Sequence, residues 1–296
     1  MPLRGSGRPN RGASRGCPGP SSGPGPGPGP QGAPRAQAQG GRLMPQPVPG
    51  STLGIDVSHW QGDINWQEVK AAGAVKWAYA KASTGETGRD KRWVQNAVDA
   101  TKAGIPIGAY HWTRPGYNSP AKEAANFVGA IKAARDAGAS VGLAPMIDLE
   151  EKPKAGTSKG ATLAYVRELA DAIESLGEPR PILYVGTNYS GVYLPDGADV
   201  GMAVWVPQYN VPSGNYGPDV KGPKWTNAIT GDWSVWQYSS KGSVPGIKGS
   251  VDMNALRPGH EGAIGLGWAG WAPGGALALL GLAGAAWWAR RKGWLG

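Results

Sequence analysis

Residues 106–150 read PIGAYHWTRPGYNSPAKEAANFVGAIKAARDAGASVGLAPMIDLE, and this stretch decides the fold class. Its two ends, PIGAYHW (106–112) and GLAPMIDLE (142–150), are short apolar runs typical of buried strands. The segment between them, residues 119–138, predicts a helix with Ser119 as its N-cap and Pro120 at its first position. A strand, a helix and a strand in this order predict a right-handed crossover between parallel strands.

The same alternation extends to both sides of this unit. It predicts strands at residues 54–59, 76–81 and 180–186 and helices at 65–73, 92–104 and 162–177. The last part of the core has strands at 202–209, 233–239 and 250–254 but few helices. Seven or eight strands in about 200 residues predict an α/β fold, an irregular TIM-like (β/α) barrel whose helices are reduced in the last third.

The positive charge of the chain lies outside this core. The formal net charge is +9, but residues 56–256 carry twenty Lys and Arg against twenty Asp and Glu. Residues 1–55 contain six Arg and no acidic residue, and residues 257–296 supply the remaining +3. The neutral core therefore does not predict a nucleic-acid partner. The single cysteine, Cys17, excludes an intrachain disulfide framework and a cysteine-based zinc site.

The N-terminal segment differs from the core in composition. Residues 1–50 form a Gly-, Pro- and Arg-rich arm with no apolar periodicity, which predicts disorder. The arm lacks the apolar segment of a secretory signal, and Met44 offers an alternative start of translation.

A long uncharged segment near the C-terminus predicts a membrane anchor. Residues 262–289 contain no charged side chain over 28 positions and are followed at once by the basic residues 290–292. We therefore predict a linker at 258–272, a transmembrane helix at 273–289 and a basic tail at 290–296 on the cytoplasmic side. The alternative is a Gly- and Ala-rich hairpin packed on the domain.

Four acidic residues are predicted to meet at one end of the barrel. Asp148 and Glu150 are two positions apart at the end of a strand, so their side chains point to the same face. Asp56 in the first strand and Asp252 in the last become their neighbours if the barrel closes first strand to last. Carboxylates gathered without bases force at least one pKa upward, as an acid catalyst requires. A Mg²⁺ or Ca²⁺ site built from the same oxygens is the rival interpretation.

Aromatic side chains surround the same strand ends. Trp and Tyr offer flat apolar faces on which a pyranose ring can pack, although about half of them are expected to fill the core. The set comprises Trp60, Tyr79, Tyr110, Trp112, Tyr184, Trp205, Tyr209, Trp236 and Tyr238. With the carboxylates it favours a glycoside hydrolase, which needs one protonated and one ionised carboxyl group at the scissile bond. His59 and His111 are expected to be structural residues.

Eight segments, in order along the chain, resemble glycoside hydrolase family 25, the Chalaropsis-type lysozymes or N-acetylmuramidases. They are GIDVSHWQG (54–62), INWQEVKAAG (64–73), KASTG (81–85), AGIPIGAYHW (103–112), PMIDLE (145–150), PILYVG (181–186), VWVPQY (204–209) and WQYSSKGSVPGIKGSVDMN (236–254). The resemblance identifies residues 51–257 as a catalytic domain. One departure is Thr84, because many members read KATEG where this chain has KASTG. It puts a subsite contact or the loop geometry in doubt, not the chemistry.

The resemblance implies a role for each acid. Glu150 is the general acid, and Asp148 is either the nucleophile or the group that orients the 2-acetamido group of the substrate. Asp56 and Asp252 shape the charge and hydrogen bonding around the cleaved bond. The resemblance also implies four groove-lining, substrate-binding residues, namely Tyr110, Tyr184, Trp205 and Gln237. We expect no metal and no cofactor.

The implied activity is hydrolysis, with retention of configuration, of the β-1,4 bond between N-acetylmuramic acid and N-acetylglucosamine in bacterial peptidoglycan. The predicted function is therefore lysis or remodelling of cell walls, carried out by a monomer. The alternative is a catalytically silent peptidoglycan-binding module anchored in the membrane. We expect the domain to be membrane-associated and to face the wall, or to be a phage endolysin that is released at lysis.

Overall fold

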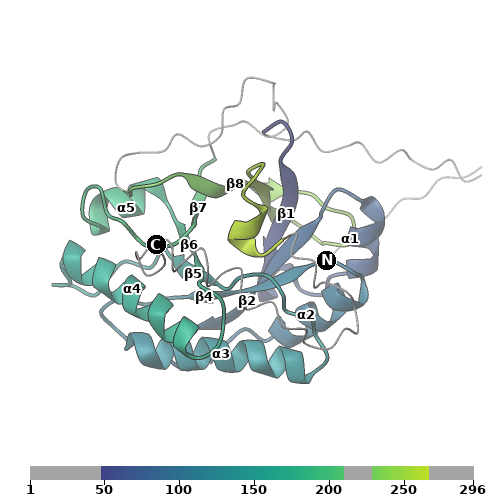
Figure 1. Cartoon of the computed structure of the whole chain (residues 1–296). Helices are drawn as coiled ribbons and strands as arrows, with labels where there is room; N and C mark the ends of the chain where they lie inside the picture. Colours follow the sequence, from purple (N-terminus) through teal and green to yellow (C-terminus); the bar gives the residue numbers. More distant parts are fainter. Residues whose placement is uncertain (1–47, 210–228, 267–296) are drawn as a thin grey trace, which may run out of the picture. The chain divides into compact units, whose positions relative to one another are not determined.

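The strands predicted from the sequence close into a barrel in the computed structural model, which describes residues 48–209 and 229–266 (Figure 1). Around the barrel the strands follow in the order β1 (Thr52–Val57), β2 (Trp77–Thr84), β4 (Ile107–Trp112), β5 (Met146–Leu149), β6 (Ile182–Val185), β7 (Val204–Pro207), β8 (Trp233–Gly242) and β9 (Val251–Leu256). Pairing of β1 with both β9 and β2 completes the circle. The short β3 (Gly88–Arg89) extends β2 as an antiparallel hairpin. The predicted α/β barrel is confirmed.

One strand departs from the predicted parallel arrangement. The pairings from β1 through β2, β4, β5, β6 and β7 to β8 are all parallel, whereas β9 is antiparallel to both of its neighbours. Only residues 243–250 connect β8 to β9, and a parallel return needs a crossover of about a dozen residues or more. The expectation of a fully parallel sheet is therefore wrong at its last strand.

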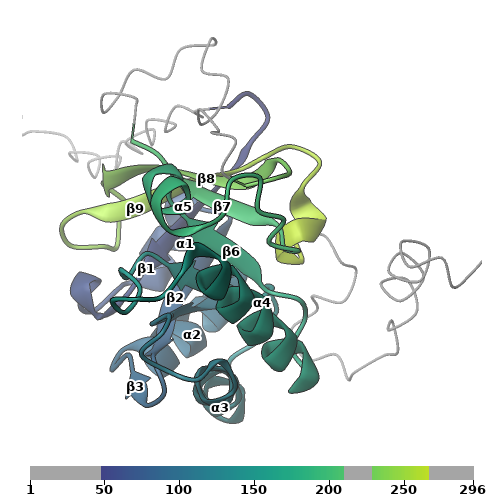
Figure 2. The same ribbon diagram turned by 90° about the vertical axis from the view of Figure 1, so that its left-hand side faces the viewer.

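Helices cover only part of the barrel. The first strands are followed by α1 (Trp66–Ala72), α2 (Trp93–Lys102), α3 (Pro120–Asp136) and α4 (Lys159–Ser175). After β6, the described residues add only α5 (Thr187–Tyr193), which the sequence did not predict, and the 3-10 helix η2 (Glu261–Ile264). Figures 1 and 2 show α2, α3 and α4 along one side of the barrel and β8 and β9 on the opposite side. The predicted loss of helices in the last third is confirmed.

The start of α3 shows how a side chain from another element replaces a local cap. Ser119 occupies the N-cap position with an extended backbone, and Pro120 begins the helix, as predicted. The Ser119 hydroxyl makes no capping hydrogen bond. Its backbone N–H instead donates to the Glu86 carboxylate at 2.9 Å, so the β2–β3 turn is joined to the start of α3.

The barrel interior is filled by large aromatic side chains. Trp77, Tyr79 and Trp205 are fully buried and meet edge to face, with ring centroids 5.1 to 5.9 Å apart. Two strand glycines make room for them. A Cβ at Gly54 would lie 2.3 Å from the Trp77 ring, and one at Gly108 would lie 2.5 Å from the Tyr79 ring. The outward-facing apolar residues of the strands form a second core under the helices.

The predictions for the two ends of the chain fall largely outside the described residues. The disordered arm at 1–50 is described only from residue 48, and the predicted transmembrane helix at 273–289 and tail at 290–296 are not described. Of the predicted linker at 258–272, residues 258–266 are described and include η2. Within residues 48–209 and 229–266, no helix is long and apolar enough to cross a membrane. All described residues belong to one compact unit.

Candidate active site

A pocket opens at the carboxyl ends of the parallel strands, the end at which barrel enzymes carry their chemistry. It holds about 480 Å³ of free space that is continuous with solvent. Ten residues line it, and they are Asp56, Tyr110, Trp112, Met146, Asp148, Glu150, Tyr184, Tyr209, Gln237 and Asp252. The lining thus includes all four predicted acids and three of the four predicted groove residues.

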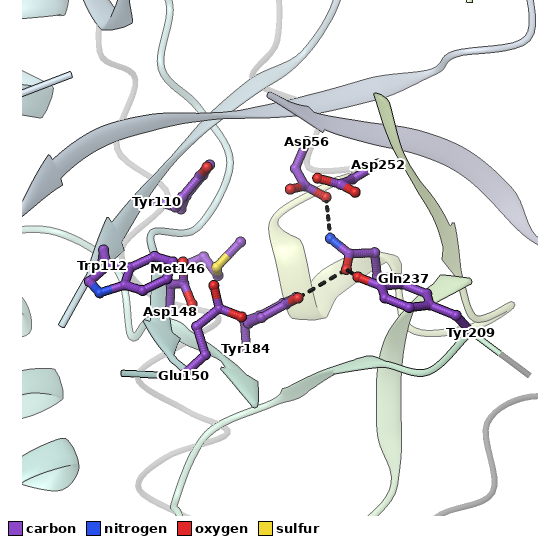
Figure 3. Close-up of a pocket in the computed structure, with 10 residues that line it drawn as sticks. All are labelled: Asp56, Tyr110, Trp112, Met146, Asp148, Glu150, Tyr184, Tyr209, Gln237 and Asp252. Carbon is purple, nitrogen blue, oxygen red and sulfur yellow. Dashed lines mark hydrogen bonds between the residues drawn. The ribbon is translucent and has the colours of Figure 1, made fainter. Parts of the chain in front are cut away.

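The four carboxylates enter the pocket from two sides (Figure 3). Asp148 belongs to β5 and Glu150 follows it by two positions, so the strand period turns both into the pocket. On the other side Asp56 of β1 and Asp252 of β9 are directly paired across the two strands. The antiparallel β9 therefore creates the predicted meeting of the first and last strands.

Asp56 is the most firmly held of the four acids. Gln237 Nε2 and Asn254 Nδ2 both donate to Asp56 Oδ2 at 2.8 Å. The hydroxyls of Tyr184 and Tyr209 donate to Gln237 Oε1, the former at 2.9 Å. Because the amide oxygen of Gln237 is occupied by two donors, its NH₂ group is the part left to face Asp56. This network favours the ionised form of Asp56.

Trp205 is the one predicted groove residue that the structure places elsewhere. It is fully buried beneath the pocket, and its indole Nε1 donates to Asn254 Oδ1 at 3.0 Å. Asn254 is in turn a donor to Asp56. The prediction that Trp205 lines the groove is therefore corrected: the side chain points into the barrel interior and supports the amide that holds Asp56.

Burial raises the pKa of every acid in the pocket, and repulsion by neighbouring acids adds to it for Asp148, Glu150 and Asp252. Burial first, then Glu150 and Asp56, raise the pKa of Asp148 well above its ordinary value, whereas Lys81 opposes the shift. Burial and Asp56 raise the pKa of Glu150, although more than a third of its surface is exposed. Burial, Asp56 and Glu150 raise the pKa of Asp252 to about 8. Burial also raises the pKa of Asp56, against the lowering effect of its two amide donors.

One oxygen of Asp148 is unusual among the described residues. Asp148 is 5% exposed, and its Oδ1 is buried without a hydrogen-bond partner in the part of the chain that the structure describes. Leaving a buried polar atom unpaired costs free energy, so each such atom needs an explanation. The described residues contain three others, Ser51 Oγ, Asn96 Nδ2 and Tyr165 Oη, but only Asp148 lines the pocket.

The aromatic set divides between the pocket and the core, as expected. Tyr110, Trp112, Tyr184 and Tyr209 line the pocket. Tyr79, Trp205, Trp236 and Tyr238 are buried in the two cores. Trp60 belongs to neither group: it lies in the 3-10 helix η1 (His59–Gln61), just after β1, with 83% of its surface exposed.

Several residues near the pocket had been given no role from the sequence. Asn254 and Lys81 were not singled out, yet Asn254 binds Asp56 and Lys81 Nζ lies 4.4 Å from the centroid of the Trp112 ring. Asn254 lies two residues after Asp252, and Lys81 lies two residues after Tyr79. Strand alternation turns all four side chains inward, so this spacing is the sequence signal that predicts their positions. Thr84, the departure from the family pattern, ends β2 and does not line the pocket.

The two predicted structural histidines are both held by side chains. His59 Nδ1 lies 2.7 Å from Asp90 Oδ2. His111 is fully buried between the Ser83 hydroxyl at 2.8 Å and the Glu123 carboxylate at 3.1 Å. In the described ranges, no three His, Cys, Asp or Glu side chains are grouped so that they could hold a metal ion.

Comparison with known proteins identifies close sequence relatives. Lysozyme M1 of Streptomyces globisporus is 34% identical in an alignment of 206 positions that covers 68% of this chain and 66% of that protein. The autolytic lysozyme of Clostridium acetobutylicum is 30% identical over 206 residues, which are 70% of this chain and 56% of that protein. The chain thus spans less than two thirds of the length of either relative.

A solved structure and a family model point the same way. The crystal structure of a bacterial lysozyme from Streptomyces coelicolor matches 71% of this chain and 93% of its own, with 27% sequence identity and a TM-score of 0.57. Residues 55–247, more than half of the chain, match the model of glycosyl hydrolases family 25. The family resemblance read from the sequence is confirmed, and this chain belongs to glycosyl hydrolases family 25.

Proposed function

We propose that this protein hydrolyses the β-1,4 bond between N-acetylmuramic acid and N-acetylglucosamine in bacterial peptidoglycan. The observation that carries the proposal is the group of four carboxylates in one pocket, with raised pKa values. None of the four forms a salt bridge with a described Lys, Arg or His. The family and the names of the two lysozyme relatives support the choice of substrate.

Glu150 acts as the general acid in this proposal. Its raised pKa keeps a proton on the carboxyl group at higher pH than an ordinary glutamate would. The proton passes to the glycosidic oxygen as the bond from that oxygen to the anomeric carbon breaks, and the leaving sugar departs as an alcohol. Water then attacks the anomeric carbon and returns a proton to Glu150, which restores the acid.

Asp148 and Asp56 face the positive charge that develops at the anomeric carbon. Asp148 either bonds to that carbon or orients the substrate's 2-acetamido group, which bonds in its place. Either role needs the ionised form of Asp148, which Lys81 favours and which a proton on Glu150 favours by removing the repulsion from that neighbour. The unpaired Oδ1 of Asp148 supports a direct contact with substrate in both routes. Asp56, whose ionised form two amide donors favour, supplies negative charge from the opposite side.

The test is digestion of purified peptidoglycan by the full chain and by Glu150→Gln. We expect new muramic acid reducing ends from the parent protein and a loss of about 10³-fold in rate for the variant, whose side chain has the same shape but cannot give a proton. Binding to insoluble wall should be unchanged. The alternative, a silent wall-binding module, predicts binding by both proteins and digestion by neither. A parent that digests no better than Glu150→Gln would overturn the proposal.

A metal-dependent hydrolase built on the same carboxylates is the second candidate chemistry. It predicts that a chelator abolishes digestion and that Mg²⁺ or Ca²⁺ restores it. We expect the rate with a chelator to equal the rate without it.

We propose that residues 273–289 hold the enzyme on a membrane with the catalytic domain on the wall side. The support is the uncharged run 262–289 and the basic residues 290–292 after it. Protease accessibility of the domain in intact cells is the test. Degradation of the domain from outside supports anchoring toward the wall, and protection until lysis supports an endolysin.

A further inference from the structure

The Trp112 indole forms one wall of the pocket and is held by its edge. Trp112 is the last residue of β4, and its ring nitrogen Nε1 donates to Glu151 Oε2 at 2.9 Å. Figure 3 shows this nitrogen on the side of the ring that faces away from the pocket carboxylates. The hydrogen bond is therefore made at the outer edge of the ring, and the rest of the ring is on the pocket side, where Trp112 is a lining residue.

Glu151 follows Glu150 directly but belongs to a different set of contacts. Arg114 Nε lies 3.1 Å from both carboxylate oxygens of Glu151, and a terminal nitrogen of the same guanidinium lies 3.1 Å from Oε1. The Tyr189 hydroxyl donates to the Glu151 backbone carbonyl at 3.0 Å. Glu151 does not line the pocket. A carboxylate held by a guanidinium fork has a fixed direction, which suits it to orient a third group.

A cation lies over the face of the same indole. Lys81 Nζ is 4.4 Å from the Trp112 ring centroid, a distance typical of a cation–π contact. The ring is thus fixed at its edge by Glu151 and over its face by Lys81. A flat side chain held in two directions cannot turn about its bonds without losing one of the contacts.

We propose that Glu151, oriented by Arg114, is a positioning residue that sets the Trp112 indole at the angle needed to pack against a sugar ring of the substrate. This inference rests on the proposed function, because it takes the pocket to bind a glycan. The Glu151–Arg114 pair is partly exposed, and a pair of that kind contributes little stability by itself. The hydrogen bond to the Trp112 indole gives the pair a role other than stability.

The test is a double-variant cycle measured on soluble glycan strands with the full chain. We expect Glu151→Ala to lower kcat/KM about tenfold, mainly through a higher KM, because a misplaced aromatic wall weakens binding more than it affects proton transfer. Trp112→Ala should lower kcat/KM at least as much. The double variant should be no worse than Trp112→Ala alone, because Glu151 acts only through the ring. Glu151→Gln keeps an acceptor for the indole and should recover most of the loss.

Glu178→Ala is the matched control. Glu178 forms an equivalent two-point pair with Arg135, with Arg135 Nη2 at 2.9 Å from Glu178 Oε2, and it precedes β6 at the opposite end of the barrel. We expect Glu178→Ala to lose thermal stability and keep its kcat/KM. An inert parent protein would reject the proposed function itself. If the parent is active, two results would reject the positioning role alone. One is a kcat/KM of Glu151→Ala equal to that of the parent, and the other is a double variant in which the losses of the two single variants multiply.

Discussion

Glu123 and Asp148 are two buried carboxylates of one domain with opposite surroundings. The Glu123 carboxylate accepts hydrogen bonds from His111 Nε2 at 3.1 Å, from Asn118 Nδ2 at 2.8 Å, and from the Thr113 hydroxyl and the Arg114 backbone N–H. Asp148 lies on β5, next to the strand that carries His111, and one of its oxygens is buried with no such partner among the described residues. Both side chains are almost completely inaccessible to solvent.

The pKa values of the two acids respond in opposite directions. Burial alone would raise both, but the hydrogen bonds of Glu123 outweigh it and lower its pKa, whereas the pKa of Asp148 is raised well above its ordinary value. Burial also lowers the pKa of His111, which favours the neutral form of its ring. The hydrogen-bonded Glu123 is thus part of the scaffold, whereas Asp148 has the raised pKa that the proposed chemistry uses.

The largest effect that separates the two acids is expected from Asp148→Asn. The variant should lose about 10³-fold in rate of peptidoglycan digestion, because an amide can neither bond to the anomeric carbon nor give the substrate's 2-acetamido group a charged acceptor. It should also gain stability at pH 7, because it removes a buried carboxyl group that resists ionisation. Urea unfolding and digestion rates measure the two effects on one preparation. If the variant is both less active and less stable, Asp148 stabilises the fold as Glu123 does.

Glu123→Gln should show the reverse pattern. The new NH₂ group faces side chains and a backbone N–H that also donate, so we expect a loss of about 3 kcal/mol in the free energy of unfolding. Because the folded pKa of Glu123 is lowered, its contribution is present above its unfolded pKa of 4.5 and is lost as the pH falls through the folded value. The stability difference between parent and variant should therefore shrink below about pH 4.5. Digestion per folded molecule should stay within about threefold.

Asp252→Asn tests the electrostatic cost of the pocket on a smaller scale. The folded pKa of Asp252 is about 8 against an ordinary value of 3.8. The part of the parent's stability that depends on protonated Asp252 is therefore fully present below about pH 4 and is lost as the pH rises toward 8. The amide of the variant cannot ionise, so the free energy of unfolding of Asp252→Asn relative to the parent should increase between those limits, by an amount on the order of 2 kcal/mol. That figure allows for partial exposure and for the linked titration of Asp56. Thermal unfolding at pH 4, 6 and 8 gives the slope, and an advantage that is equal at all three values would contradict this account.

The smallest expected effect concerns the rim of the site. Trp60→Ala should weaken binding of long glycan strands by about threefold, because an exposed ring beyond β1 adds one apolar contact to a substrate that extends past the pocket. Its stability should be unchanged, because 83% of the side chain is exposed. Val192→Ala, at another exposed apolar residue, is the control. Equal binding by both variants would limit the substrate contact to the pocket.

Much of the site could be predicted because a strand alternates with a period of two. That period placed Asp148 and Glu150 on one face, and closure of the barrel placed Asp56 beside Asp252. The period does not say how deep along the barrel axis an inward side chain lies. The family resemblance implied a groove position for Trp205, whereas its side chain packs below the groove.

The remaining differences depend on contacts between distant parts of the chain. The partners of Glu123 come from β4 and the segment after it, and the carboxylate of Glu151 binds Arg114 across 37 positions of sequence. Such pairs leave no periodic signal in a single sequence. Helix α5 was missed because its sequence, TNYSGVY, is short, contains a glycine and shows no apolar stripe.

The most direct test of the central claim is a ¹³C NMR titration of the side-chain carboxyl groups in the full chain, with the Asp148 and Glu123 signals assigned from Asp148→Asn and Glu123→Gln. We predict that Asp148 titrates well above its ordinary pKa of 3.8 and that Glu123 titrates below its ordinary pKa of 4.5. An Asp148 signal that titrates at or below 3.8 would show that the pocket stabilises its charge, and the claim that the pocket holds these acids at the expense of stability would be wrong.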